Sequence, residues 1–246
     1  MLSLVMTAML MLGVPIGDGW QLDRTTGKIG LEQAQTVVIH NMQGDVRVRA
    51  GAVEEIEWIL NAQRMDEDPY RAELKIDRVD GRLILDVQFE GEGDSKAEWA
   101  RRRADLTVLL PAQAESDFRT LDGLIEAKGI ESPLQAHSTS GNIVLASAAP
   151  VKARTEHGTL KLDLKSDQLS TTPDLSTATG NIELWVPFEA KLRLSGETEG
   201  RITTDFSLSI ERQGRLKVFE ALISRDGAGV ALRSIRGDIQ LFQSDR

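Results

Sequence analysis

The chain contains three histidines, a residue type that often binds metal ions in proteins. His40, His137 and His157 could hold a transition metal, with Glu156 beside the third. His137 lies four residues before a glycine of the recurring phrase defined below, and His157 lies one residue before the next such glycine. The histidines therefore occupy unequal places in the phrase and form no ladder. We expect surface turn or strand residues, with no metal site and no cofactor.

Carboxylates could cleave a polysaccharide, because glycosidases use a pair of Asp or Glu side chains. Glu126, Asp163 and Glu183 are candidates on predicted outward positions. At one equivalent position of the phrase, however, the successive residues are Glu, Val, Lys and Glu at 126, 144, 161 and 183, so no acidic stripe forms. The Gly-x-Ser-x-Gly motif, phosphate loops and dinucleotide fingerprints are also missing from the sequence. We expect no enzyme.

Tryptophans could stack on sugar rings. The sequence has Trp20, Trp58, Trp99 and Trp185. Trp185 stands between two aliphatic residues in a strand pattern, so a place in the core or in a cap is an equal alternative.

A short recurring phrase predicts the elements that position these side chains. A small polar cluster precedes a glycine, and aliphatic residues follow two and, in most copies, four places later. Between positions 123 and 200 the glycines are 18, 17, 22 and 20 residues apart, a period typical of stacked repeats. The phrase glycines, called motif glycines below, are Gly44, Gly123, Gly141, Gly158, Gly180, Gly200 and Gly237.

The register of the phrase predicts strands with one buried face. Two places after the glycine, all residues are branched aliphatics, including Ile143, Leu160, Ile182 and Ile239, whereas the next position varies freely. One winding of such a chain cannot bury its own apolar face, so successive windings must stack. The pattern predicts an all-β, solenoid-like stack. The glycine either turns the corner with positive φ or lets adjacent windings approach closely.

The pattern of apolar, charged and turn residues divides the chain into three parts. Residues 1–19 are mostly apolar and too short to span a bilayer comfortably, which favours a signal peptide, with a buried strand or retained anchor as the alternative. Residues 20–110 form an N-terminal β portion with a hairpin at Asp80-Gly81 and a charged insert at 91–104 that could form a helical turn. Residues 111–246 form the repeat portion.

Composition excludes several function classes. The 246 residues are 41% hydrophobic, enough for a core, and contain no cysteine, which excludes disulfides and thiolate chemistry. The formal charge of −9, with Lys and Arg scattered singly, predicts no nucleic-acid partner.

These phrases together resemble the DUF4097 family of adhesin-like bacterial domains. The resemblance covers roughly residues 33–242 and lies in the order and spacing of the phrases; the charged insert and uneven winding lengths depart from it. It implies a right-handed β-helix or β-solenoid without established catalytic residues. The segments that carry it are Asn41–Val46, the strand ending at Pro111, Ser138–Ile143, Ser176–Ile182 and Gly237–Ile239.

The expected function is a non-enzymatic module of the cell envelope, exported to the periplasm or cell surface, that acts in adhesion-like binding or as a scaffold. Its partner would be an unknown protein or envelope component, and the end windings could support self-association. Ile239 is expected in the last winding, where a charge would block end-to-end stacking. The alternatives are a bactofilin-like polymerising cytoskeletal β-helix and a polysaccharide-active β-helical enzyme.

Overall fold

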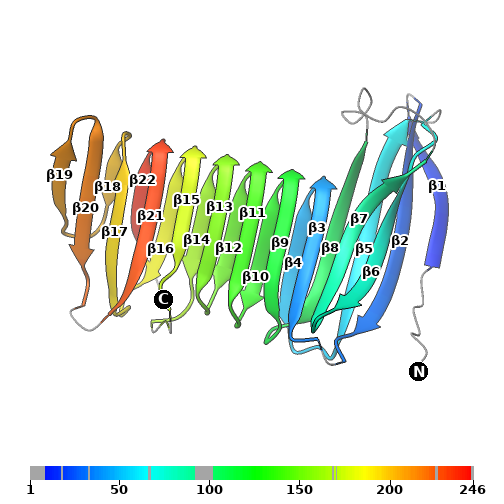
Figure 1. Cartoon of the computed structure of the whole chain (residues 1–246), viewed down its shortest axis with the longest axis horizontal. Helices are drawn as coiled ribbons and strands as arrows, with labels where there is room; N and C mark the ends of the chain where they lie inside the picture. Colours follow the sequence, from blue (N-terminus) through cyan, green and yellow to red (C-terminus); the bar gives the residue numbers. More distant parts are fainter. Residues whose placement is uncertain are drawn as a thin grey trace.

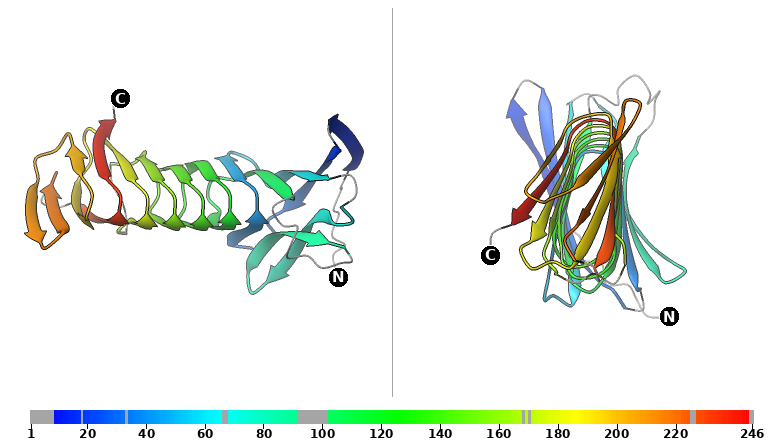
Figure 2. Two further views of the ribbon diagram at one scale, coloured as in Figure 1. Left: turned by 90° about the horizontal axis from the view of Figure 1, so that it is seen from above. Right: turned by 90° about the vertical axis from the view of Figure 1, so that its left-hand side faces the viewer.

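The chain folds into two β-sheets that lie face to face (Figures 1 and 2). The computed structural model describes residues 9–17, 19–32, 34–65, 68–91, 102–167, 169, 171–224 and 227–244. Sheet A has 11 strands in the order β1 (Met9–Gly17), β2 (Trp20–Gly30), β5 (Glu55–Met65), β8 (Arg103–Pro111), β4 (Val46–Gly51), β10 (Ile125–Ile130), β12 (Ile143–Ser147), β14 (Leu160–Leu164), β16 (Ile182–Pro187), β22 (Ile239–Ser244) and β18 (Ile202–Thr204). Sheet B has 11 strands in the order β19 (Ser209–Gln213), β20 (Leu216–Leu222), β17 (Leu192–Thr198), β21 (Ala228–Arg236), β15 (Asp174–Thr179), β13 (Val151–His157), β11 (Leu134–Ser140), β9 (Glu115–Asp122), β3 (Thr36–Gln43), β7 (Arg82–Glu90) and β6 (Arg71–Val79).

The all-β prediction is confirmed for the described residues. None of them forms a helix with the length and apolar character needed to cross a membrane. The possible helical turn of the charged insert falls on residues 92–101, outside the described residues.

Consecutive strands alternate between the sheets from β9 to β16, and each is parallel to its neighbours (Figure 1). Ile143 is in register with Leu160, and Leu160 with Ile182, so equivalent positions of the phrase stack directly. Ile182 is next in register with Ile239. These four side chains are at most 1% exposed, and fully burying one aliphatic side chain of this size contributes about 1.5–3 kcal/mol.

Two consecutive strands, one in each sheet, are called a strand pair below, as in β9–β10. The order of these pairs along the stack departs from chain order at both ends. The expectation that Ile239 lies in the last winding is wrong, because β22 lies between β16 and β18. Its partner β21 likewise lies between β15 and β17, so the pair β17–β18 is the outer one although it precedes β21–β22 in the sequence. At the other end, β7 and β8 lie outside β3 and β4 in the same way.

The motif glycines form a continuous column at the bends between sheet B and sheet A. A Cβ atom on any of them would collide with the main-chain carbonyl of the neighbouring strand pair, so each position excludes a side chain. Four of them also have φ between +130° and +156°, whereas Gly141 has no left-handed φ. Close approach of neighbouring main chains is therefore the requirement shared by every motif glycine. The order along the column is Gly44, Gly123, Gly141, Gly158, Gly180, Gly237 and Gly200.

A ladder of buried hydroxyl groups follows the glycine column. Thr177 donates to the carbonyl of Gly158 at 3.1 Å, and Thr155 donates to that of Gly141 at 3.0 Å. Thr120, Thr198 and Ser234 make the same bond to the glycine carbonyl of the adjacent strand pair. Each bond satisfies a carbonyl, half-buried in most copies, that the bend leaves outside the sheet ladders. Ser138 is the exception among the described residues, because its buried Oγ has no hydrogen-bond partner.

The Asp or Asn after the motif glycine joins adjacent bends on the solvent side. Asn142 Oδ1 accepts the backbone N–H of Thr159 at 2.8 Å, and Asn181 Oδ1 accepts that of Asp238 at 2.8 Å. Asp238 Oδ1 in turn accepts the N–H of Arg201 at 2.8 Å. The Gly-Asp or Gly-Asn pair thus supplies both the close approach and the oxygen that bonds across it.

Antiparallel hairpins close sheet B at both ends. The predicted hairpin at Asp80-Gly81 is confirmed: β6 and β7 pair antiparallel, and both turn residues have positive φ. At the far end, β20 pairs antiparallel with β17 and with β19. Lys217 Nζ donates to the carbonyl of Gly200, the last glycine of the column. The N-terminal segment from Met9 to Gly17 pairs antiparallel with β2, and residues 1–8 lie outside the described residues.

Candidate functional site

Two rows of polar side chains cross the outer face of sheet B. One of these rows contains the residues four places before successive motif glycines, and the strand registers put them side by side. We call these residues the cationic row: Arg119, His137, Arg154, Ser176 and Arg233. Arginine recurs on every second strand of the row. The Cα atoms of successive arginines therefore lie about 10 Å apart, twice the spacing of neighbouring strands.

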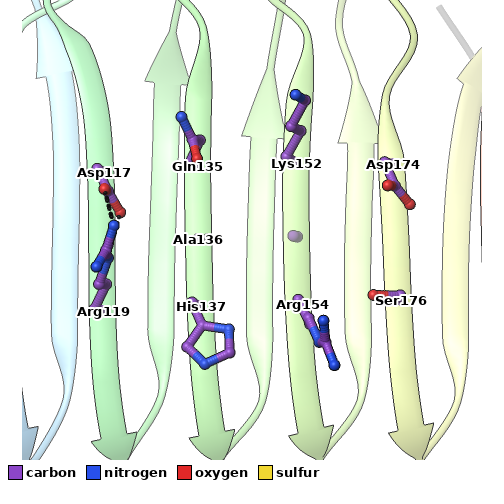
Figure 3. Close-up of a pocket in the computed structure, with 10 residues that line it drawn as sticks. Asp117, Arg119, Gln135, Ala136, His137, Lys152, Arg154, Asp174 and Ser176 are labelled. Atoms are coloured by element: carbon purple, nitrogen blue, oxygen red, sulfur yellow. Dashed lines mark hydrogen bonds and ion pairs between the residues drawn. The ribbon is translucent and has the colours of Figure 1, made fainter.

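A shallow groove of about 370 Å³ runs across the strands between the two rows (Figure 3). Asp117, Gln135, Lys152 and Asp174 form its first wall, and four members of the cationic row, from Arg119 to Ser176, form the second. The floor contains Ala136 and Ala153, whose methyl groups point into the core at 2% exposure. Because successive residues of a strand face opposite sides, an elongated ligand in the groove would lie across the strands.

Ion pairs neutralise part of this face. Arg119 donates to both oxygens of Asp117, at 3.0 and 2.6 Å, which closes one end of the groove and raises the pKa of Arg119. Arg233 pairs with Glu197 at 2.7 Å.

Strand β13 supplies the uncompensated positive charge. Among the described residues, no carboxylate lies within ion-pairing distance of Lys152 or Arg154, and both side chains are exposed. The groove therefore presents two cations outside any ion pair among the described residues: Lys152, beside Asp174 in the first wall, and Arg154 in the second. This occurs in a chain whose formal charge is −9.

The three histidines do not form a metal site in the described part of the chain, where no group of three His, Asp or Glu side chains could hold an ion. His40 and His137 stand on β3 and β11, with Arg119 of β9 in register between them. His157 lies at the end of β13, in register with Ser140 and Thr179.

The candidate carboxylates face outward on sheet A and are held by cations. Glu126 pairs with Arg49 at 3.1 Å and with Lys128 at 2.7 Å, and the hydrogen bond from Lys128 does most to lower the pKa of Glu126. Partial burial opposes ionisation of Glu183, but hydrogen bonds from Lys161 and Trp185 outweigh it and lower the pKa of Glu183. A general acid needs a raised pKa, so neither carboxylate is arranged for that role.

Separation also argues against a paired-carboxylate mechanism. Glu126 and Glu183 occupy the same register position three strands apart, about 14 Å, whereas glycosidase carboxylates lie about 5 to 9.5 Å apart. Asp163 is nearer to Glu183, on the adjacent strand, but pairs with Lys165 at 2.6 Å.

The tryptophans are divided between core and surface. Trp58 is 3% exposed and packs against Gly27, where a Cβ would collide with the indole. Trp185 is half-buried on the outer face of sheet A, and its ring centroid lies 4.8 Å from that of Phe242 in a tilted pair. Trp20 is half-buried on β2, and Trp99 lies outside the described residues.

A second cavity, of about 310 Å³, adjoins β3 and β7. Its lining includes Tyr70 and Arg102, and the Arg102 guanidinium lies 3.8 Å from the Tyr70 ring centroid. Burial opposes ionisation of Asp68, but its ion pair with Arg102 at 2.5 Å helps to lower the pKa of Asp68. This buried pair ties Arg102, near the end of the charged insert, to Asp68 in the segment before β6, which is a structural role.

Sequence reasoning missed the cationic row and the hydroxyl ladder, although both have a signal. Aligning the chain on its motif glycines places Arg or His four residues upstream in most copies and a hydroxyl three residues upstream.

Comparison with known proteins supports the fold. No protein-family model and no curated protein matches the sequence. A solved structure provisionally named as a cell adhesion protein from Clostridium sporogenes is similar over 91% of this chain and 100% of its own, with 10% identity and a TM-score of 0.51. A provisionally named adhesin from Bacteroides fragilis covers 89% of this chain and 96% of its own at 10% identity, with a TM-score of 0.28. A provisionally named lipid binding protein from Parabacteroides distasonis has 11% identity, covers 90% of this chain and 97% of its own, and has a TM-score of 0.28. At these identities the first likeness concerns the fold alone.

Proposed function

We propose that this chain is a non-enzymatic, adhesion-like binding or scaffold module of the cell envelope. We further propose that it is built as a right-handed β-solenoid of the DUF4097 kind. One observation supports the proposal above all: on the long outer face of sheet A, the carboxylates of Glu126 and Glu183 are held by cations instead of being grouped for proton transfer. Such a face suits contact with an extended partner, as the concave or flat faces of stacked-repeat proteins do.

Export is part of this proposal and can be tested directly. Cells that express the gene from its own start would be fractionated, and the N-terminus of the purified chain would be sequenced. A mature chain in the envelope or periplasm that lacks the apolar segment supports the proposal. A cytoplasmic chain that retains Met1 contradicts it and favours the bactofilin-like polymer.

Binding is tested by co-sedimentation of the purified chain with washed envelopes. The expected result is saturable pelleting that unlabelled chain competes away. A chain that stays in the supernatant at every envelope concentration contradicts a binding role.

Self-association through the outer strands is proposed as a further property of the scaffold. Strand β19 forms one edge of sheet B and its Ile210 is 49% exposed, so this edge offers free main-chain groups and an apolar side chain. Ile210→Lys is expected to abolish concentration-dependent growth in sedimentation velocity. Ile239, which is buried between β16 and β18, is unsuitable for this test because a charge there would unfold the chain. A wild-type chain that is monomeric at all concentrations would remove this property.

A further inference from the structure

We propose that the groove on sheet B binds a linear acidic polysaccharide, which lies across the strands along the cationic row. This inference rests on the proposed binding function and names the class of ligand and its site. Three observations support the inference jointly: the groove, the recurrence of arginine, and the uncompensated charge on β13.

The direction of the groove selects a linear ligand. Its walls are the two polar rows, and its floor is the main chain around Ala136 and Ala153, so it is one residue wide and several strands long (Figure 3). A membrane surface would have to cover both walls at once and would meet the carboxylates of Asp117 and Asp174 in the first. A single polymer chain avoids this by resting between the walls.

The spacing of the arginines selects the charge density of the ligand. Within the groove, Arg119 and Arg154 stand two strands apart, about 10 Å. Arg233 continues this spacing two strands further on, but it lies outside the groove and pairs with Glu197. This separation suits a polysaccharide with one carboxylate on every second sugar. Nucleic acid carries one charge per about 3.4 Å along each strand, far denser than the row, and the net charge of −9 would repel such a polyanion.

The side chains of the groove suit both parts of an acidic sugar chain. Arginine can hold a carboxylate through two parallel N–H donors, and Arg154 has no competing carboxylate among the described residues. Arg119 uses Nε and one terminal nitrogen on Asp117, which leaves N–H groups on its other terminal nitrogen. Gln135, Ser176 and Asp174 supply donors and acceptors for sugar hydroxyl groups, which a bare row of cations would lack.

The test uses hyaluronate oligosaccharides, which carry one carboxylate per disaccharide, measured by isothermal titration calorimetry at low salt. We expect binding that weakens as salt is added. Arg154→Gln is expected to weaken binding about tenfold, the loss of one charge-assisted hydrogen-bonding partner. Arg215→Gln is the matched control, because Arg215 is exposed in the turn between β19 and β20 and carries the same charge far from the groove. The affinity of the Arg215→Gln variant for hyaluronate is expected to equal that of the wild type.

Each outcome bears on the proposal. Equal losses in Arg154→Gln and Arg215→Gln would show unspecific charge attraction and overturn it, as would equal binding of neutral dextran. Tighter binding of a single-stranded oligonucleotide than of hyaluronate would overturn it in favour of nucleic acid. If the wild type and Arg154→Gln pellet equally with envelopes and neither binds hyaluronate, the groove proposal fails and the proposed envelope function stands. If the wild type binds neither envelopes nor hyaluronate, both fail.

Discussion

Replacing Gly141 by alanine isolates the requirement for close approach within the glycine column. Gly141 has no left-handed φ, so alanine meets no conformational penalty there. The added Cβ would, however, lie 2.0 Å from the carbonyl oxygen of Gly123. Any loss of stability in Gly141→Ala therefore reports the collision between neighbouring strand pairs and not strain in the backbone.

The size of the effect follows from the movement that alanine demands. Relieving the collision takes a separation of about 1 Å, because Cβ atoms do not approach oxygen much closer than 3 Å. The bonds from Gly123 N to the carbonyl of Ser140 at 3.2 Å and from Ile125 N to that of Asn142 at 3.0 Å flank this contact and would break. Two bonds of about 1 kcal/mol each and an overpacking cost of about 1–3 kcal/mol predict a loss of about 3–5 kcal/mol.

Urea unfolding followed by far-UV circular dichroism measures this loss. The matched control is Gly51→Ala, since a Cβ on Gly51 has no atom within 4 Å and its φ is not left-handed. That variant is expected to be unchanged or stabilised by up to about 1 kcal/mol, through a smaller entropy of the unfolded chain. If Gly141→Ala unfolds at the same urea concentration as Gly51→Ala, the close approach is not a requirement and the reasoning is refuted.

Three further predictions test the ladder, the core and the surface carboxylates. Thr177→Val is expected to lower the free energy of unfolding by about 1–2 kcal/mol, because it removes the donor to the half-buried carbonyl of Gly158. Ser138→Ala removes an unpartnered hydroxyl and is expected to change this free energy by less than about 0.5 kcal/mol. Equal losses in urea titrations would contradict the ladder. Ile143→Asp buries an unpaired charge and is expected to cost several kcal/mol, so near-UV circular dichroism should show lost tertiary packing, and a native spectrum would contradict the placement of Ile143 in the core. The pKa of Glu126 is lowered on folding, so its contribution to stability is complete above its ordinary pKa of 4.5 and disappears as the pH falls through the lower folded value. Glu126→Gln is therefore expected to be less stable than the wild type at pH 7 and to lose less stability on acidification, as urea unfolding at pH 7 and pH 3 would show; parallel acid slopes would contradict this.

The inward face of the stack could be predicted because burial constrains residue type. Ile143, Leu160 and Ile182 occupy one position of the phrase, and the structure places them in register. The two-residue alternation of strands makes such a position recognisable without an alignment. The Asp80-Gly81 hairpin was predictable for a different reason, because tight turns demand positive φ.

The order of the strand pairs could not be predicted, because equivalent phrases carry no information about which copy lies beside which. The phrase at Gly237 continues with Asp-Ile-x-Leu as at other copies, so it does not reveal that it lies next to Gly180 and not next to Gly200 alone. The cationic row was hidden for a related reason. Outward positions accept Arg, His and Ser alike, so an alignment on the motif glycines shows only a recurrence of residue type, and the registers of β9 to β21 are needed to place these side chains side by side.

The position of β21 and β22 has a consequence for how the molecule assembles on the ribosome. Strand pairs from β9–β10 to β15–β16 can dock in the order in which they are synthesised, each on the one before. The segment β17–β18 emerges next but finds its parallel partners only in β21 and β22, so it must wait until Ser244 has been translated. The growing stack thus halts at β16 and is completed in one late step. For the same reason, gene duplication can lengthen the molecule between Gly123 and Gly180, whereas extra copies appended after β22 would find that flank already occupied.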